Sequence, residues 1–317
     1  MNTSFEQVEQ LTSQLDINHK QLLINLLEGQ VSGKSCLDVL AMHRDSAHNC
    51  PHCQSRAVKR NGKVSGRQRY FCNTCRKSFM CTFNTPFYGL RTPEKWLGYL
   101  DCMTKSLTVR HSAKESDVTK NTSFLWRHRF LKLLNIQSNT HLSGIVEMDE
   151  TLFRYSEKGN HFLTRPSHKR GGDKAGRGRE KGDWVPVLVA RDRQKQTFDE
   201  RLESTTGEAL YQLLKTHIDK DAVICSDGFR AYGVLARKLG VKRKSINLSK
   251  GIRVVEKAFH IQNVNSYRSQ LHNWMYRFCG VATKYLNNYL GWFRFLESND
   301  NPNKNNLLLL QTQLIGT

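Results

Sequence analysis

The chain has 317 residues, enough for about two or three domains, and its 49 Lys and Arg against 28 Asp and Glu give a formal charge of +21. Such a surplus repels itself unless a polyanion offsets it, so nucleic acid is the favoured partner class and an anionic membrane surface is the alternative. No apolar run approaches the roughly 20 residues of a membrane-spanning helix, and the N-terminus lacks the apolar core of a signal peptide. We therefore expect a cytoplasmic protein whose nine cysteines are thiols or metal ligands rather than disulfides.

Residues 1–47 have leucines at near-helical spacing and predict a helical segment without evident chemistry. Residues 48–82 differ, because they contain two Cys-x-x-Cys pairs, Cys50 with Cys53 and Cys72 with Cys75. Zinc prefers four soft ligands in a tetrahedron, and two pairs at this spacing complete that shell. The segment is therefore predicted to be a zinc ribbon with a structural Zn²⁺.

Within this ribbon, residues 59–62 are predicted to form a turn and residues 67–71 a strand. His52 lies inside a Cys-x-x-Cys pair and Cys81 lies out of register, so with four thiolates present neither is expected to be a ligand. The alternative for the four cysteines is a redox dithiol pair. The basic residues of the ribbon suggest contact with DNA phosphates, although such ribbons can also bind protein.

Residues 91–135 predict a helix-turn-helix-like DNA-binding region. A helix starts at Pro93, a short helical segment follows, and after a break residues 122–134 continue as a basic amphipathic helix. Arg127 and Arg129 on that helix are candidate DNA contacts. The alternative is that the helices only pack against one another.

Residues 144–297 predict an α/β domain, because strand-like stretches at 144–149, 184–190, 197–202 and 222–226 are combined with amphipathic helices. Residues 298–317 are predicted to form a C-terminal tail. Between the first two strands, residues 165–183 are rich in glycine and basic side chains and predict a mobile loop. Its candidate phosphate contacts are Lys169, Arg170, Arg177 and Arg179. The alternative is a solvated loop that has no function.

Two of these strands end in an aspartate, Asp149 and Asp227. Carboxylates at strand ends of a basic α/β domain favour a hard divalent cation such as Mg²⁺ or Mn²⁺, which can promote displacement at phosphorus. The alternative is that each aspartate caps the turn or helix that follows it. Glu147 and Glu150 flank Asp149, and strand alternation predicts that both are surface carboxylates pointing away from it.

Several motifs, in this order and spacing, resemble bacterial insertion-sequence transposases with a zinc ribbon and an ISXO-type catalytic domain of the DDE superfamily. The motifs are CPHC (50–53), RYFCNTCRKSF (69–79), VEMDET (146–151), SDGFRAY (226–232), HIQNVNS (260–266) and GVATKYLNNYL (280–290).

The resemblance implies an RNase H-like fold in residues 144–297, with Asp149, Asp227 and Asn265 as the catalytic Mg²⁺ ligands. Asn265 takes the place of a third carboxylate and brings no charge. Glu256 is a remaining acidic candidate for this third position. The family tends to carry Lys seven residues beyond the third ligand, where this chain has His272.

Aromatic residues recur at roughly helical spacing near the C-terminus, from Trp274 and Tyr276 to Phe295. This pattern is more typical of a helix core than of a platform on which bases stack, and we interpret it as core.

Together these features predict a DNA transposase of a bacterial insertion sequence, which is associated with the nucleoid when bound to DNA. It would bind terminal inverted repeats and catalyse Mg²⁺-dependent strand cleavage and strand transfer on double-stranded DNA, as a homodimer or larger assembly. Two alternatives stay open. One is a zinc-dependent DNA-binding protein or a decayed transposase without catalysis, and the other is an RNase H-like nuclease that cuts without joining.

Overall fold

The computed structural model describes residues 35–47, 49–135, 140–164, 184–246, 251–299 and 302–312. The chain divides into two compact units, one of residues 1–124 with 302–317 and the other of residues 125–301, and the division falls within helix α6. In these described ranges, no helix is both long and apolar enough to cross a membrane.

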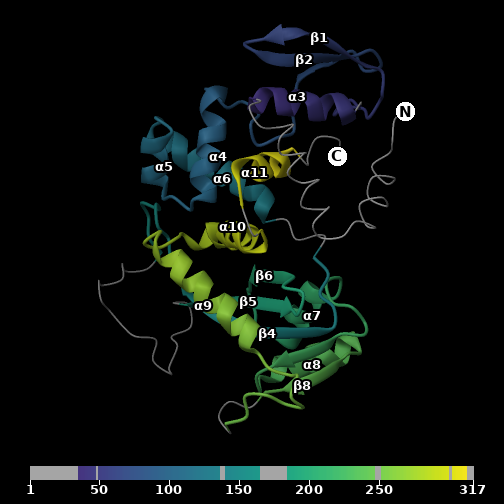
Figure 1. Cartoon of the computed structure of the whole chain (residues 1–317), viewed down its shortest axis with the longest axis vertical. Coiled ribbons are helices and arrows are strands. Elements are labelled where there is room, and N and C mark those ends of the chain that lie inside the picture. Colours follow the sequence, from purple (N-terminus) through teal and green to yellow (C-terminus); the bar gives the residue numbers. More distant parts are fainter. Residues whose placement is uncertain are drawn as a thin grey trace. The chain divides into compact units, whose positions relative to one another are not determined.

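The first unit combines a small sheet with short helices (Figure 1). Its elements are α3 (Cys36–Ala47), β1 (Val58–Val64), β2 (Arg67–Cys72), β3 (Ser78–Met80), the 3-10 helix η1 (Pro93–Lys95), α4 (Trp96–Thr104), α5 (Val109–Glu115), the start of α6 (Lys120–Leu134), and α11 (Lys304–Gln311).

Strands β1, β2 and β3 form an antiparallel sheet in that order. Val64 pairs with Arg67 across Ser65 and Gly66, whose φ angles of 48° and 75° are those of a tight two-residue hairpin turn. The predicted turn at residues 59–62 is therefore wrong. That stretch belongs to β1, where Gly62 at φ 67° lies in an irregularity of the strand pairing that bends the strand without ending it.

The helices expected between residues 91 and 135 are present as α4, α5 and α6. Thr108 caps α5 by accepting a hydrogen bond from the His111 amide at 3.4 Å. Ser123 on α6 donates to the Val109 carbonyl at 2.8 Å and also contacts the Tyr99 hydroxyl at 3.0 Å, so it joins the three helices. The predicted tail contributes α11, whose Leu307 and Leu308 are fully buried and which packs against α4.

The second unit is built around a larger sheet. Besides the remainder of α6, its elements are β4 (Ile145–Arg154), β5 (Trp184–Asp192), β6 (Thr197–Arg201), α7 (Gly207–Leu214), β7 (Val223–Ser226), α8 (Arg230–Leu239), β8 (Lys242–Ser245), α9 (Gln262–Tyr276), the 3-10 helix η3 (Thr283–Tyr285) and α10 (Leu286–Ser298).

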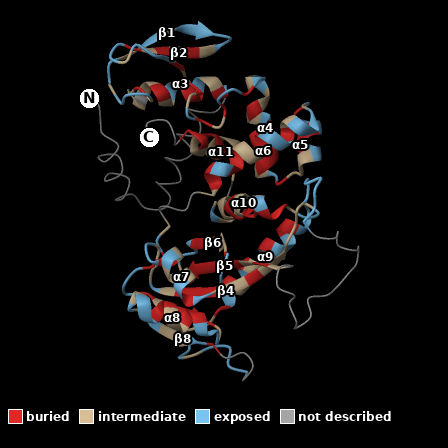
Figure 2. Ribbon diagram, turned by 180° about the vertical axis from the view of Figure 1, so that it is seen from behind, coloured by how far each residue is buried: buried red, intermediate tan, exposed pale blue. Residues whose placement is uncertain are grey.

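The strand order is β6-β5-β4-β7-β8. Strand β4 is central, antiparallel to β5 and parallel to β7, and β8 continues the parallel side. Helices α7 and α8 cover one face through a core that includes Val146, Met148, Leu210 and Leu235, while α9 and α10 pack against the sheet through β4, β5 and β6 (Figures 1 and 2). The predicted α/β class is confirmed.

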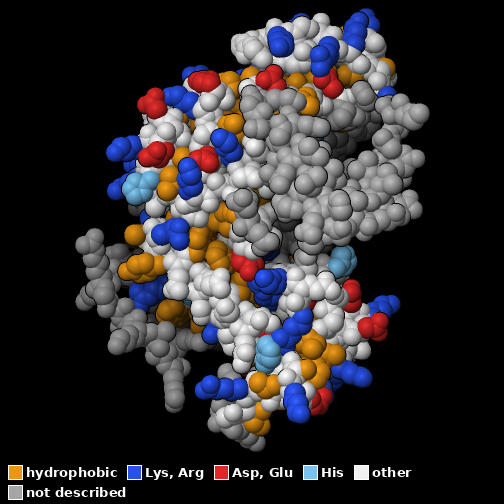
Figure 3. Space-filling model, viewed as in Figure 1, with side chains coloured by type: hydrophobic (Ala, Val, Ile, Leu, Met, Phe, Trp, Pro, Cys, Tyr) orange, Lys and Arg blue, Asp and Glu red, His pale blue; other side chains and the backbone are white. Residues whose placement is uncertain are grey.

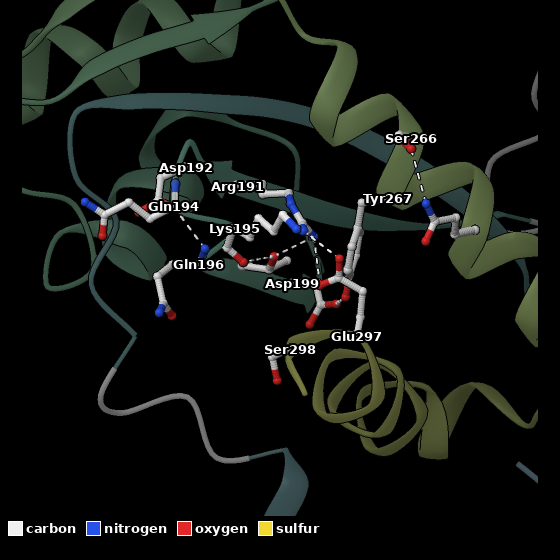
Figure 4. Close-up of polar contacts among 12 residues, drawn as sticks. Arg191, Asp192, Gln194, Lys195, Gln196, Asp199, Ser266, Tyr267, Glu297 and Ser298 are labelled. Atoms are coloured by element: carbon white, nitrogen blue, oxygen red, sulfur yellow. Dashed lines mark hydrogen bonds and ion pairs between the residues drawn. The ribbon is translucent and has the colours of Figure 1, made fainter. Parts of the chain in front are cut away.

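Buried ion pairs attach α9 and α10 to the sheet (Figure 4). Arg191 on β5 pairs with Glu297 on α10 at 2.6 Å. Asp199 on β6 accepts a hydrogen bond from the Tyr267 hydroxyl of α9 at 2.6 Å and pairs with Arg294 of α10. Because Asp199 is fully enclosed, these partners replace the water that its charge would otherwise require. These contacts hold α9 against β6 and α10 against β5 and β6.

Candidate active site and metal centre

The two candidate aspartates lie side by side at the edge of the sheet. Met148 of β4 is in register with Ser226 of β7, and Asp149 and Asp227 follow directly. Strand β7 ends at Ser226 whereas β4 runs on to Arg154, so Asp149 lies where its parallel neighbour stops. Crevices at the carboxyl ends of parallel strands are where α/β proteins bind ligands. The structure thus brings together the two residues singled out from the sequence.

Asp149 is largely buried, and its neighbours shift the pKa of its carboxyl in opposite directions. Burial raises the pKa of the Asp149 carboxyl, the Arg268 guanidinium opposes this, and the nearby charge of Asp227 adds to the rise. The Glu150 amide donates to Asp149 Oδ1 at 2.9 Å. Arg268 donates to Asp149 Oδ2 and, at 3.2 Å, to the Glu150 carbonyl.

Asp227 also has a structural contact, since its Oδ1 accepts a hydrogen bond from the Phe229 amide at 2.9 Å just before α8 begins. The capping alternative is therefore realised for one of its oxygens. Arg243 of β8 braces the same turn by donating to the Ser226 hydroxyl at 3.0 Å and the Asp227 carbonyl at 2.5 Å. This turn is held so that the Asp227 carboxyl interacts with that of Asp149.

Glu150 is not the surface carboxylate predicted from strand alternation. Burial raises its pKa to about 7, and the charges of Asp149 and Asp227 contribute to the rise while the Tyr232 hydroxyl opposes it. Alternation does direct Glu150 to the opposite face from Asp149, but Tyr232 of α8 packs in the core on that face and lies near Glu150. Glu150 thus lies close enough to the aspartate pair to add to its negative charge.

Glu147 is likewise not a surface carboxylate, because it is fully buried and anchors the start of α9. Its carboxylate accepts from the Asn263 amide at 2.8 Å, the Asn263 side chain at 2.9 Å and the Val264 amide at 3.0 Å. Arg193 and His260 lie 3.1 and 3.3 Å from Glu147 Oε1. A carboxylate at this position satisfies amides that the first helical turn leaves unpaired and interacts favourably with the helix dipole.

Replacing Glu147 with Ala should lower the free energy of unfolding by about 3 kcal/mol, because Arg193 and the first amides of α9 lose a buried partner. The shift in the urea unfolding midpoint measures this. Glu208→Ala is a matched control, since Glu208 pairs with Lys238 on the exposed surface of the same unit and its loss should leave the midpoint nearly unchanged. Equal shifts for both variants would contradict the anchoring role.

Helix α9 carries two positions singled out from the sequence, Asn265 and His272. Asn265, the predicted third ligand, is half-buried one turn before Arg268, and its role as a ligand stays a prediction. His272 makes a 2.6 Å contact between its Nε2 and the Thr151 hydroxyl and stacks on Phe153. Burial, with a contribution from Arg268, lowers its pKa, so it provides no cation where the resembled family tends to have Lys. The remaining acidic candidate, Glu256, is exposed and pairs with Lys244 of β8.

Sequence reasoning missed Arg268. Its position in a polar stretch of α9 does not distinguish it from the many other basic residues, and only packing of α9 on β4 brings it to Asp149. The donor set here consists of hard oxygens at one edge of the sheet, which suits Mg²⁺ or Mn²⁺. Arg268 donates to Asp149 Oδ2, so a cation bound at that oxygen would compete with the guanidinium.

Replacing Arg268 with Met should tighten Mn²⁺ binding about tenfold, because a competing positive charge is removed from a partly buried carboxylate. Isothermal titration with Mn²⁺ in the absence of DNA measures this affinity. Arg237→Met on α8 is the control, since Arg237 bonds to the Gly233 carbonyl of its own helix and should leave the affinity unchanged. Unchanged or weaker binding by the Arg268 variant would refute the competition.

The four predicted zinc ligands also come together. The sulfur atoms of Cys50, Cys53, Cys72 and Cys75 all lie within 4.8 Å of one another, and neither His52 nor Cys81 is part of the cluster. Among the residues that the structure describes, this is the one group of three or more His, Cys, Asp or Glu close enough to share a metal.

The two Cys-x-x-Cys pairs have matching backbone geometry. The residue after each second cysteine, Gln54 or Arg76, has a positive φ near 60° and donates its amide to the carbonyl of the first cysteine, at 2.8 and 3.0 Å. This turn directs backbone amides toward the first sulfur of each pair. In one pair, the amide of Cys75 is the main reason that the pKa of Cys72 falls to about 6. The fit to zinc rests on the geometry of the cluster, since four sulfur atoms within 4.8 Å of one another can supply the four soft ligands of a tetrahedral site.

The predicted DNA contacts have different outcomes. Lys169, Arg170, Arg177 and Arg179 lie outside the described residues. Arg127 is fully buried, with its guanidinium 4.5 Å from the centroid of the Trp292 ring, so its assignment as a phosphate contact is wrong. Arg129 is half-buried and stays a prediction. The ribbon, by contrast, presents exposed basic side chains along β1, Lys59 and Lys63 among them (Figure 3).

Residues 141–297 match the family model described as the ISXO2-like transposase domain. The matched region contains both aspartates, Asn265 and all five strands of the larger sheet. Among solved structures, a chain from "Crystal structure of a pre-cleavage Mos1 transpososome" is 12% identical, with 68% of this chain and 78% of that chain covered and a TM-score of 0.21.

Proposed function

We propose that this chain, whose residues 141–297 are an ISXO2-like transposase domain, is the DNA transposase of an insertion sequence. The observation that carries the proposal is the adjacent placement of Asp149 and Asp227 at the ends of two parallel strands within that domain. The formal charge of +21 supports DNA as the substrate, because phosphate neutralisation dominates affinity for nucleic acid.

In this proposal Asp149, Asp227 and Asn265 hold Mg²⁺ or Mn²⁺, which when bound supplies the positive charge that an in-line displacement at phosphorus requires. Glu147 anchors α9 and thereby keeps Asn265 and Arg268 over the strand that carries Asp149. Arg268, once displaced from Asp149, is a cation within reach of a scissile phosphate. Glu150 and Tyr232 enclose the other side of the aspartate pair.

Two chemical steps follow from the proposal. Water attacks the phosphorus at the element end, so that one phosphorus–oxygen bond forms, another breaks and a 3′-hydroxyl is released. The 3′-oxygen of that end then attacks a phosphodiester of the target, loses its proton and displaces the target's own 3′-oxygen. The zinc ribbon and the helices α4 to α6 recognise the terminal inverted repeats, and a homodimer or larger assembly holds two ends together.

The proposal has two rivals, a DNA-binding protein without catalysis and a nuclease that cuts without joining. Purified protein is incubated with Mg²⁺, a labelled duplex taken from the DNA that flanks the reading frame, and a supercoiled plasmid. Labelled DNA joined to the plasmid supports the transposase. Cleavage of the end without joining supports the nuclease, and a gel shift without cleavage supports the DNA-binding protein.

A further inference from the structure

A cavity of about 520 Å³ lies beside the candidate active site and is not explained by metal binding. It is formed by the end of β4 and the segment after it, by the last turn of α9 and by the segment leading into α10. A second hollow of about 500 Å³, lined by Glu150, Thr151 and Arg268 among others, adjoins the aspartate pair. His272 lines both, so the two hollows share one wall.

Hydrogen bonds join the segments that line this cavity, so the cavity is preformed. The Ser156 amide donates to the Thr283 hydroxyl at 2.9 Å, and the Thr283 amide donates to the Ser156 carbonyl at 2.8 Å. The Lys158 ammonium donates to three successive carbonyls, of residues 278, 279 and 280, at 3.3, 3.1 and 2.8 Å. Ligand sites are usually preformed in this way, and this volume lies within the range of about 300–1,000 Å³ that such sites span.

Several aromatic side chains line the cavity. Phe153 and His272 stack at 4.5 Å between centroids with an interplanar angle of 7°. Tyr276, which also lines the cavity, is 86% exposed, whereas Trp274, Tyr289 and Trp292 of the same aromatic series are buried. The core interpretation of that series is thus correct for those three residues and wrong for Tyr276. Tyr276 thus presents an aromatic ring to solvent at the edge of this preformed cavity.

We propose that this cavity receives one unpaired nucleobase of the DNA strand that occupies the active site, and that the base stacks on Tyr276. The inference rests on the proposed function, which supplies the DNA. Every base offers a π-face to an aromatic ring, and enzymes that act on duplexes can turn a nucleotide out of the stack into a pocket. Phe153 is four residues beyond Asp149 on β4, about 13 Å along the strand, which corresponds to about four nucleotides of a DNA strand.

The test compares two duplexes of the element end that differ at a single nucleotide. In one the nucleotide is mismatched, so its base is present but unpaired, and in the other it is abasic. The comparison is repeated at each nucleotide along the end, without divalent metal, and dissociation constants are measured by fluorescence anisotropy. Neither duplex has a base pair at that position, and comparing the difference in the unchanged protein with that in Tyr276→Ala isolates the contact of the base with the Tyr276 ring.

At one position, the mismatched duplex should bind about tenfold more tightly than the abasic one. Tyr276→Ala should abolish this difference, and Tyr276→Phe, which keeps the ring, should preserve it. Since Tyr276 is exposed, neither variant should alter the fold. Binding without such a position, or a difference that survives in Tyr276→Ala, overturns the inference and leaves the proposed function standing. Failure to bind the element end at all overturns the proposed function itself.

Discussion

Asp149→Asn should reduce cleavage of the element end at least about 1,000-fold while leaving the protein folded. The substitution keeps the shape of the side chain and removes the charge that the catalytic cation needs. Metal-assisted displacement at phosphorus draws several kcal/mol from that cation, and each 1.4 kcal/mol is about a tenfold change in rate. Asp227→Asn should have the same effect, because the two carboxylates lie next to each other at the ends of β4 and β7.

Cleavage of a labelled duplex in Mg²⁺ measures the rate, and thermal unfolding monitors the fold. The control is Asp221→Asn, which removes an exposed carboxylate just before β7 and should leave the rate unchanged. Full activity in Asp149→Asn would remove Asp149 from the active site. An equal loss in Asp221→Asn would show that the assay reports the overall charge of the domain rather than the site.

Cys72→Ser should abolish stoichiometric zinc and unfold the ribbon. Cys72 ends β2 and contacts the Cys53 sulfur at 3.7 Å, and its pKa, lowered to about 6, favours the thiolate that the metal requires. A hydroxyl cannot replace that ligand at neutral pH, and small metal domains generally do not stay folded without their metal. Mass spectrometry of the metal measures the zinc content. Limited proteolysis between residues 49 and 90 measures the unfolding of the ribbon.

Cys81→Ser is the matched control, because Cys81 is equally buried in the same unit and lies outside the sulfur cluster. It should retain zinc and resist proteolysis as the unchanged protein does. Zinc retained by the Cys72 variant would refute the ligand set, and zinc lost from the Cys81 variant would extend it.

Features that depend on short-range pattern were predicted well. The Cys-x-x-Cys pairs are such a pattern, because two residues between ligands fix the turn, and the sulfur atoms meet as expected. Asp149 and Asp227 were found for a similar reason, since a buried strand followed by a carboxylate can be read from the sequence. Strand β8 was not predicted because its residues, KRKS, lack apolar alternation. Charged side chains on an edge strand such as β8 prevent further strands from pairing with it. The same charges remove the alternation of apolar residues by which a strand is recognised in a sequence.

Features that depend on distant packing could not be predicted. Arg127 looks like an exposed cation on an amphipathic helix, but Trp292, 165 residues later, covers it. Glu147 was assigned to the face opposite Asp149, but it lies two residues before Asp149 and alternation places both on the same face. Glu150 does take the opposite face, and alternation does not tell what covers that face. Helix α9 covers Glu147, and Tyr232 of α8 lies near Glu150. Arg268 was missed for the same reason, since its partner Asp149 is 119 residues away.

A precleaved element end shows whether the chain transfers strands. Two duplexes are prepared that are identical except that the end carries a 3′-hydroxyl in one and a 3′-hydrogen in the other. Each is incubated with the protein, Mg²⁺ and supercoiled plasmid. If the chain is a transposase, the 3′-hydroxyl end becomes covalently joined to the plasmid and the 3′-hydrogen end does not, because the attacking oxygen is missing. If both ends bind and neither is joined, or if the plasmid is nicked equally with both, the chain does not transfer strands and is not a transposase.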